Sequence, residues 1–443
     1  CSPHIVQVTD INSLRDDQTR PQVLISGEIH GDERVGPGVT IPLAQLLQLD
    51  LMGGISKGQR TWLAFLATRR ETLIIPTANC MGYMKNIRSD GHIDPNRDYP
   101  YSRKDERCFL SSSARLFKVI METSIIQTVV TFHGGMVALG YEWGSKNHMT
   151  PKDRSPDENA HKSVALQMKE YAGGFKQEKP YPVGRINSLI YPVDGGMEDW
   201  LYAAGWDPGN MQQHCVEKFT NPRILTARTT AVTKAENRAV VFLVETSNWK
   251  KPLDSSLGGT DKVTILHCII LDPSASQNGH IPRNVRLSLT AIDMVQPYVC
   301  FKTLKETLSE NTPSLDSATQ LAVEWYVGGA TTVDCTFLAW HPYPANGISE
   351  TSNSTVNCFP RPIGNSHTNT DTTSSTDQSF PPGRYLLVSW AMTDQNFGDS
   401  RQGFPMDSAP QSHLSNIRTN PAYRKQVHDR IVQGRMFWPS DPI

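Results

Sequence analysis

Apolar segments of two different lengths alternate along the first part of this chain. From Cys1 to about Pro252, short strand-type runs are each followed by a longer stretch of helical spacing. The strand-type runs are residues 23–25, 72–77, 129–132, 188–191 and 239–244, and the helical stretches are 39–51, 61–70, 114–123, 159–172 and 198–204. Such alternation predicts the α/β class, with a mixed, mostly parallel sheet and helices on both faces.

The pattern changes after residues 252–260, a Gly- and Ser-rich stretch that is typical of a linker. Short β-type runs follow, separated by Pro, Gly and Asn, at 263–271, 285–292, 320–327, 333–340 and 384–390. A β-sandwich is the simplest fold for such runs. Within this part, residues 349–379 are rich in Ser, Thr and Asn and predict a long, mobile loop, and residues 421–435 have helical spacing.

The composition is that of an ordinary globular protein. The chain has 443 residues, 38% of them hydrophobic and 20% charged, with a net charge of -1. A near-neutral balance argues against nucleic acid or an anionic membrane as the main partner. The chain also contains no apolar run as long as a membrane span, and its length allows two or three domains.

Cysteine usage favours a secreted or extracellular protein with disulfide bonds. The eight cysteines form no CxxC pair, so a cysteine zinc site is not expected. We expect the pairs Cys80–Cys108, Cys268–Cys300 and Cys335–Cys358. Asn353 begins a glycosylation sequon, which predicts a glycoprotein. The chain opens on Cys1 rather than Met, so we also expect a processed or trimmed N-terminus.

A His and a Glu stand three residues apart in the Gly-rich turn that follows the first strand-type run. His30 and Glu33 lie in the sequence GEIHGDE, at the strand end where open α/β sheets bind ligands. An imidazole and a carboxylate suit zinc, which needs a third protein ligand and an open position. His133 ends the run TVVTFH and is placed to be that ligand, although each of these residues alone is more often structural.

Other polar side chains follow the remaining strand-type runs. Asn96 and Arg97 lie in a polar, Pro-bounded loop, where an Arg fork and an amide can hold a carboxylate, unless they only stabilise a turn. Tyr191 precedes a second Gly-rich turn and could instead be packing at the rim of the core. Glu245 interrupts the apolar strand VVFLVETS, so it must find a partner, such as Lys250 or Lys251, stay neutral or act chemically.

Six motifs in the same order, GEIHGDE, NCMGY, DPNRDYP, FHGG, IYPVDGGMEDW and VFLVETS, resemble those of the zinc metallocarboxypeptidases of the carboxypeptidase A/B type. The resemblance covers about residues 23–252. It implies a zinc carboxypeptidase-like catalytic domain over 1–253, with the β-sandwich-like region 254–443 as an accessory domain. The implied activity is hydrolysis of the C-terminal bond of peptides or proteins, with one Zn²⁺ per chain.

The resemblance also implies roles for the residues around the metal. His30, Glu33 and His133 would be the zinc ligands, and Asp94 would orient one ligand histidine. Glu245 would be the general base, acting on a water whose pKa the zinc lowers.

Other positions would contact the substrate. Asn96 and Arg97 would hold its terminal carboxylate, and Tyr191 would close over it. An arginine that polarises the scissile carbonyl is expected upstream; Arg88 is the best candidate, and Lys85 is an alternative that the spacing does not exclude.

One acidic residue has two competing interpretations. Glu198, seven residues after Tyr191, falls where the family places the floor of its specificity pocket, and an acid there would favour Lys or Arg as the residue released. It could equally compensate the dipole at a helix N-terminus. Residues 205–238 form an insertion that is long for the family and that could line or cap the pocket.

Two other functions compete with a carboxypeptidase. An amidohydrolase or deacylase of the same superfamily would share the metal ligands and the Asn-Arg pair, but tends to lack the closing tyrosine. A secreted binding protein on an inactive peptidase fold would have lost a ligand or the base, and here both Glu33 and Glu245 are present.

Overall fold

The computed structural model describes residues 1–14, 20–51, 57–102, 108–124, 126–203, 239–261, 276–296, 298–307, 320–329, 335–342, 367–373, 385–392 and 437–439. Its contacts divide the chain into two compact units. The first contains Cys1–Val295 and the second begins at Gln296. The candidate site lies entirely in the first unit.

The first unit is built on one mixed sheet. Its described strands are β1 (Val6–Val8), β2 (Gln22–Gly27), β3 (Glu71–Ile75), β4 (Ile126–His133), β5 (Met136–Tyr141), β6 (Val183–Arg185) and β7 (Val240–Ser247). They are ordered β1-β3-β2-β4-β7-β5-β6. Strands β3, β2, β4 and β7 are parallel, whereas β1 and β5 run antiparallel to their neighbours β3 and β7. The predicted mixed, mostly parallel sheet is confirmed.

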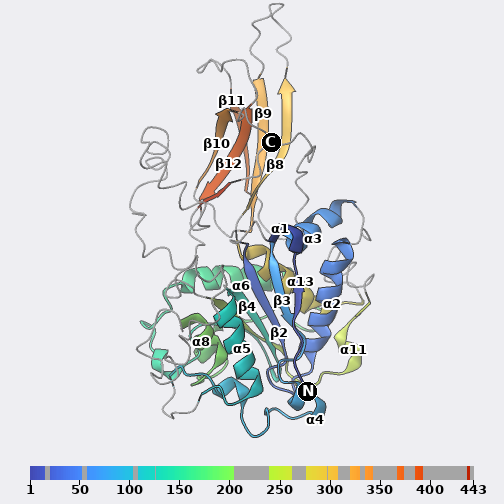
Figure 1. Ribbon diagram of the computed structural model, residues 1–443, viewed down its shortest axis with the longest axis vertical. Helices are drawn as coiled ribbons and strands as arrows, with labels where there is room; N and C mark the ends of the chain where they lie inside the picture. Colours follow the sequence, from blue (N-terminus) through green and yellow to red (C-terminus); the bar gives the residue numbers. More distant parts are fainter. Residues whose placement is uncertain are drawn as a thin grey trace, which may run out of the picture. The chain divides into compact units, whose positions relative to one another are not determined.

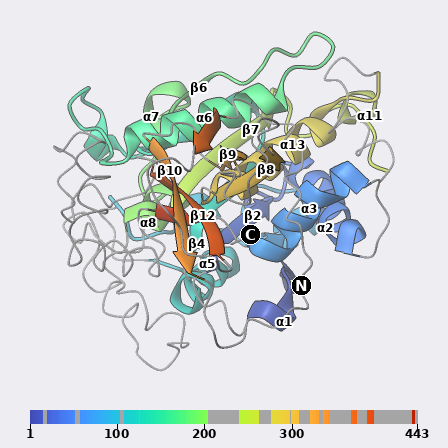
Figure 2. The same cartoon turned by 90° about the horizontal axis from the view of Figure 1, so that it is seen from above.

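Helices cover both faces of this sheet (Figures 1 and 2). One face carries α2 (Val35–Leu51), α3 (Lys57–Arg69), α6 (Glu158–Ala172) and α13 (His280–Met294). The other face carries α5 (Ser112–Thr123) and α8 (Met197–Ala203). Short helices α1 (Ile11–Leu14), α4 (Cys80–Lys85), η1 (Pro95–Arg97), η2 (Lys146–His148), α7 (Ile186–Leu189) and α11 (Asp254–Leu257) lie in the connections.

The core forms because the central strands are apolar on both faces, as expected of a covered parallel sheet. Every residue of β2 is buried. On the α5 and α8 face, Leu24 and Val129 pack in one cluster with Phe117 and Trp200. This packing fixes α8, which carries two acidic residues of the site, against the sheet.

Two of the predicted strands are helices. The run 188–191 overlaps α7 (Ile186–Leu189), because a run of four residues is too short to distinguish a strand from a helix by its periodicity. The run 285–292 lies inside α13, which is buried throughout. Arg286 in α13 donates to the carbonyls of Tyr171 and Ala172 at the C-terminal end of α6, a tertiary contact that residue spacing does not reveal.

The first unit extends beyond the predicted boundary at residue 253. Helix α13 packs against α2 and α6, and Asp293 accepts a hydrogen bond from Trp62 Nε1 in α3 at 2.9 Å. The predicted linker contains the short helix α11.

The second unit contains antiparallel strands. One sheet has the order β11-β9-β8, from strands β8 (Tyr298–Thr307), β9 (Gln320–Gly328) and β11 (His367–Thr373). The other has the order β10-β12-β13, from strands β10 (Cys335–Pro342), β12 (Tyr385–Met392) and β13 (Phe437–Pro439). Strands β9, β10 and β12 match predicted runs, whereas β11 falls inside the predicted loop 349–379.

Cys80 is bonded to Cys1 and not to Cys108, so one predicted disulfide is wrong. Cys108 is itself disulfide-bonded. Several predictions fall outside the described residues: the sequon at Asn353, the insertion 205–238, the run 263–271 and the helical tail 421–435. Each of the other two predicted disulfides has one cysteine outside them, Cys268 or Cys358.

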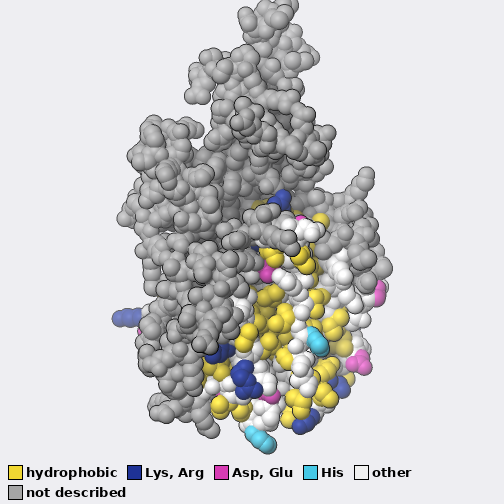
Figure 3. Space-filling model, viewed as in Figure 1, with side chains coloured by type: hydrophobic (Ala, Val, Ile, Leu, Met, Phe, Trp, Pro, Cys, Tyr) yellow, Lys and Arg dark blue, Asp and Glu magenta, His cyan; other side chains and the backbone are white. Residues whose placement is uncertain are grey.

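The described surface of the first unit is mixed in character. Apolar side chains stand among charged ones on the face drawn in Figure 3, and both signs of charge are present. Among the described helices, none combines the length and apolar character needed to cross a membrane.

Candidate metal centre and adjoining cavity

The parallel strands bring four of the predicted site residues to one edge of the sheet. His133 is the last residue of β4 and is the register partner of Glu245 in β7. Gly27, the last residue of β2, is the register partner of Phe132. His30 and Glu33 follow three and six residues after Gly27, so the turn after β2 carries them over the end of β4.

The turn after β2 has little conformational freedom. Glu28 is buried and has a positive φ of 55°, a region that side chains other than Gly rarely adopt. A Cβ at Gly31 would lie 2.1 Å from the carbonyl carbon of Gly82 in α4, so the close approach of these segments requires glycine. The Glu33 backbone N–H donates to the carbonyl of His30 at 3.2 Å. These constraints fix the positions of both side chains.

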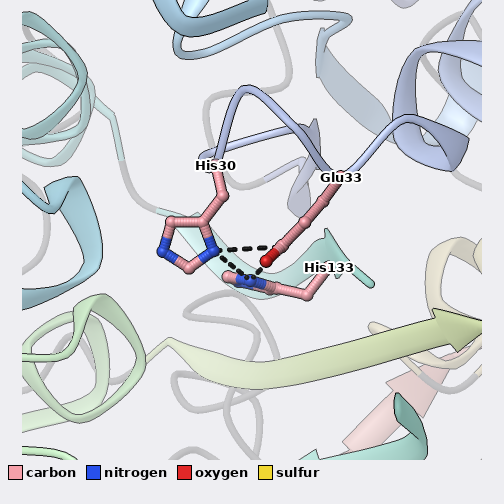
Figure 4. Close-up of side chains that lie close together, drawn as sticks. All are labelled: His30, Glu33 and His133. Atoms are coloured by element: carbon pink, nitrogen blue, oxygen red, sulfur yellow. Dashed lines mark hydrogen bonds and ion pairs between the residues drawn. The ribbon is translucent and has the colours of Figure 1, made fainter. Parts of the chain in front are cut away.

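His30, Glu33 and His133 point toward one another (Figure 4). Glu33 Oε2 lies 3.0 Å from Nδ1 of His30 and 3.0 Å from Nδ1 of His133, and the two Nδ1 atoms are 3.2 Å apart. All three residues are buried. Three lone-pair atoms this close need a shared proton or a cation. Two imidazole nitrogens and a carboxylate oxygen form a donor set that fits zinc.

The charges in the cluster shift its protonation when no metal is present. Although burial lowers the pKa of His133, its contacts with Glu198 and Glu33 raise that pKa to about 10. Burial raises the pKa of Glu33, but the neighbouring histidines outweigh it and hold that pKa well below its ordinary value. The site therefore stabilises positive charge between these side chains.

Asp94 contacts the face of His30 that is turned away from the cluster. Its Oδ1 lies 3.1 Å from His30 Nε2 and also accepts the backbone N–H of Asn96 at 3.0 Å. Pro95 at the start of η1 has the φ that this turn needs. With Nε2–H directed at Asp94, Nδ1 of His30 presents a lone pair to the cluster.

Of the two cations considered for the scissile carbonyl, Arg88 is the one at the cluster. Its Nη1 lies 3.0 Å from Glu33 Oε1, and its Nε donates to Asp94 Oδ2 at 2.9 Å. Lys85 is exposed at the end of α4. The geometry therefore favours Arg88 for this role.

Glu245 is buried beside the cluster, with 7% of its surface exposed. Burial raises the pKa of Glu245, and the positive charge of His133 partly opposes that rise. Among the described residues, its Oε2 has no hydrogen-bond partner. Lys250 instead pairs with Asp32, with Nζ and Oδ2 2.7 Å apart. A carboxylate placed in this way is suited to accept a proton.

A cavity adjoins the cluster and contains the other predicted substrate-binding residues. His30, His133 and Glu245 line it together with Asn96, Arg97 and Tyr191. Tyr191 follows α7 in a loop and is 44% exposed. The Arg97 guanidinium lies 5.9 Å from the centre of the Tyr191 ring. The cavity walls also contain Ile186, Ile190 and Leu243.

Two acidic residues of the first turn of α8 also line this cavity. Glu198 lies against Asn96, Thr131 and His133. Asp199 accepts the backbone N–H groups of Gly144 and Ser145 at 2.8 and 2.7 Å. Both carboxylates are buried. Although burial raises the pKa of Glu198, its contact with His133 lowers that pKa overall, so Glu198 adds negative charge to the cavity wall.

Three residues make contacts at the site that the sequence does not reveal. Thr131 donates to Glu198 Oε1 at 3.3 Å, and Lys250 Nζ lies 3.7 Å from Glu33 Oε1. Asp199 forms the backbone contacts described above. No motif in the sequence indicates these contacts; only the alternation of β4 suggests that Thr131 and His133 share a face.

Burial raises the pKa of Asp199 to about 7, and the charge of Glu142 raises it further against the two backbone N–H groups. Between its ordinary value of 3.8 and about 7, the folded protein binds a proton that the unfolded chain does not. Stability from this group therefore falls as pH rises through that window. An Asp199→Asn variant should not lose stability in this way. Between pH 5 and 7 its free energy of unfolding should therefore rise relative to that of the wild type by on the order of 2 kcal/mol.

Thermal unfolding of both proteins at pH 5 and pH 7 measures this difference, because other titrating groups cancel. An unchanged difference in unfolding temperature between the two pH values would show that Asp199 is ionised throughout.

Residues 4–217 match the family model described as zinc carboxypeptidase, the peptidase M14 family. The resemblance inferred from the six motifs is thereby confirmed over most of its predicted extent. Members of this family are zinc enzymes, and the His30, Glu33 and His133 cluster lies within the matched residues.

Individual relatives are distant. Carboxypeptidase SOL1 of Arabidopsis thaliana is 23% identical over 195 residues, which are 42% of this chain and 38% of the plant protein. Carboxypeptidase A from Helicoverpa armigera aligns with 65% of this chain and 64% of its own, at 14% identity and a TM-score of 0.43. Bovine thrombin-activatable fibrinolysis inhibitor aligns with 65% of this chain and 83% of its own, at 11% identity and a TM-score of 0.39. The chain thus spans well under half the length of the plant relative.

Proposed function

We propose that this protein is a zinc-dependent carboxypeptidase that hydrolyses the C-terminal peptide bond of peptides or proteins. The observation that carries the proposal is the convergence of a three-atom metal donor set with a buried, incompletely partnered Glu245 on one cavity. Asn96 and Arg97 line the same cavity. The family match over residues 4–217 supports the same reaction class.

His30, Glu33 and His133 would hold one Zn²⁺ per chain. Bound zinc would polarise the scissile carbonyl and lower the pKa of a coordinated water to about 7. Asp94 would keep His30 oriented, since it already lies 3.1 Å from the outer ring nitrogen. The Arg88 guanidinium would stabilise negative charge that develops on the carbonyl oxygen.

Glu245 would act first as a general base and then as a general acid. Burial raises the pKa of Glu245, and such a rise makes the carboxylate a stronger base for the first step. In this mechanism it removes a proton from the attacking water and delivers it to the departing amine.

Asn96 and Arg97 would bind the terminal carboxylate of the substrate, which restricts cleavage to the last residue. An Arg guanidinium pairs with a carboxylate through two parallel N–H donors, and an amide can add a third. Tyr191 is exposed at the cavity rim and would cover the bound residue. The buried charge of Glu198 would favour Lys or Arg at that position.

A panel of peptides that differ only in the last residue tests the proposal. Each is offered as the free acid and as the C-terminal amide, with and without a chelator. We expect chelator-sensitive release from the free acids alone, fastest for Lys and Arg. No release by the zinc-loaded protein would favour an amidohydrolase or deacylase, and a protein that binds no zinc would favour a binding function.

Replacing Arg97 by Ala should lower kcat/KM for free-acid peptides roughly 30- to 700-fold, since loss of one partner of a buried charge pair costs about 2–4 kcal/mol. The rate with amidated peptides should change little, so the preference for free acids should shrink. Arg154→Ala, which removes a guanidinium that is 65% exposed, is the matched control. If the Arg97 variant kept the full preference for free acids, a residue other than Arg97 would have to bind the terminal carboxylate.

We further propose that the first unit, Cys1–Val295, carries the catalytic function and that the antiparallel strands of the second unit belong to a β-sandwich-like accessory domain. Secretion is proposed from the Cys1–Cys80 disulfide, since disulfides persist in oxidising compartments. Glycosylation at Asn353 is proposed from its sequon.

A further inference from the structure

The Glu198 carboxylate contacts both halves of the proposed site. On the metal side, its Oε1 lies 3.5 Å from Nε2 of His133, and the Thr131 hydroxyl donates to the same oxygen at 3.3 Å. On the substrate side, the Asn96 amide nitrogen lies 3.2 Å from Oε2 and 3.4 Å from Oε1. Glu198 is 4% exposed, so water does not compete strongly for these contacts.

These contacts determine how two functional side chains are oriented. His133 presents Nδ1 to Glu33, so its other ring nitrogen faces Glu198. Asn96 is held at both ends by α8, because its Oδ1 accepts the Met197 backbone N–H at 2.7 Å while its amide nitrogen faces Glu198. One of the two amide hydrogens of Asn96 is then directed at Glu198, and the other remains for a ligand.

We propose that Glu198 is a positioning residue that holds the metal ligand His133 and the carboxylate-binding Asn96 in register with each other. This role is additional to the negative charge that Glu198 gives the cavity, and it rests on the proposed carboxypeptidase function. It is analogous to the contact of Asp94 with His30, so that a carboxylate orients each of the two histidines.

A carboxylate is chemically required for this role. Asn96 and Thr131 donate hydrogen bonds to Glu198, and Nε2 of His133 faces the same carboxylate at 3.5 Å. An acceptor with two oxygens can face all three groups. An amide in its place would turn an NH₂ group toward one of these donors. Glu198→Gln keeps the size of the side chain, so it tests the hydrogen bonding without leaving a cavity.

The first measurement is zinc affinity, determined by competition with a chelating dye for the full-length chain. Loss of a residue that orients a metal ligand typically weakens metal binding 10- to 100-fold, so Glu198→Gln should bind zinc that much more weakly. Glu170→Gln, an exposed carboxylate on α6, is the matched control and should bind like the wild type. Zinc affinity of Glu198→Gln within twofold of the wild type would overturn the proposal.

The second measurement compares peptides ending in Lys and in Leu, with each variant saturated with zinc. A positioning role predicts a higher KM for both peptides by a similar factor, because Asn96 binds the carboxylate common to them. An effect on KM confined to the Lys peptide would contradict the positioning role and show that Glu198 acts only through its charge in the cavity. If the wild type cleaves neither peptide, the proposed function fails, while the zinc affinities still decide whether Glu198 positions His133.

Discussion

Replacing Glu245 by Gln is expected to lower kcat about 10²- to 10⁴-fold, the range that a positioned general base contributes. The amide has nearly the same shape but cannot take a proton from water. Glu245 is not one of the three residues whose ligand atoms converge, so zinc should remain bound at wild-type stoichiometry. KM should change little, because the carboxylate-binding residues are untouched.

Metal content by mass spectrometry and steady-state kinetics on a single free-acid peptide measure both parts of this prediction. Glu170→Gln again provides a carboxylate-to-amide change on an exposed surface. If Glu245→Gln kept more than a tenth of the wild-type kcat, another group would have to be the base. If it lost its zinc, the variant would report on metal binding and not on proton transfer.

The metal cluster and Glu245 could be predicted from the sequence because these residues stand at or just after the ends of parallel strands. Once β2, β4 and β7 are recognised as neighbours, His133 and Glu245 must lie side by side, and the turn after β2 must pass above them. Local pattern and motif order together carry that information. The choice between Arg88 and Lys85 needed the fold, since it depends on how the chain turns after α4.

Contacts between distant elements could not be predicted in this way. The two interpretations of Glu198 considered only its neighbours in the sequence, whereas its contacts with His133 and Asn96 come from strand β4 and helix η1. Lys250 was considered as a partner of Glu245, but the turn after β7 directs it to Asp32.

The errors in the predicted fold also come from contacts between distant parts of the chain. The segment 285–292 has an apolar content that suits a strand or a buried helix, and its packing on α2 and α6 decides between them. The sequence suggests Cys108 as the partner of Cys80, whereas the structure bonds Cys80 to Cys1, 79 residues away. Disulfide pairing depends on proximity in space, which sequence separation does not give.

Glu33→Ala is expected to abolish stoichiometric zinc binding and reduce activity to background. The variant loses the only carboxylate of the donor set and leaves two histidines, which are a weaker set for zinc. It also leaves Arg88 and Lys250 without the anion that lies 3.0 and 3.7 Å from them. Arg88 and Lys250 would keep Asp94 and Asp32 as partners, but without Glu33 the net charge around the metal position becomes more positive. That charge would oppose entry of a divalent cation, so this loss should exceed that of Glu198→Gln.

The same change should destabilise the metal-free protein by about 3–5 kcal/mol, because it removes the carboxylate that lies 3.0 Å from His133 in a buried ion pair. Zinc content, activity and the unfolding temperature in chelator are the three measurements, with Glu170→Ala as the control on α6. Retention of one zinc per chain by Glu33→Ala would show that the metal is held by other groups. An unchanged unfolding temperature in chelator would instead show that Arg88 is stabilised by Asp94 alone, whose Oδ2 lies 2.9 Å from Arg88 Nε.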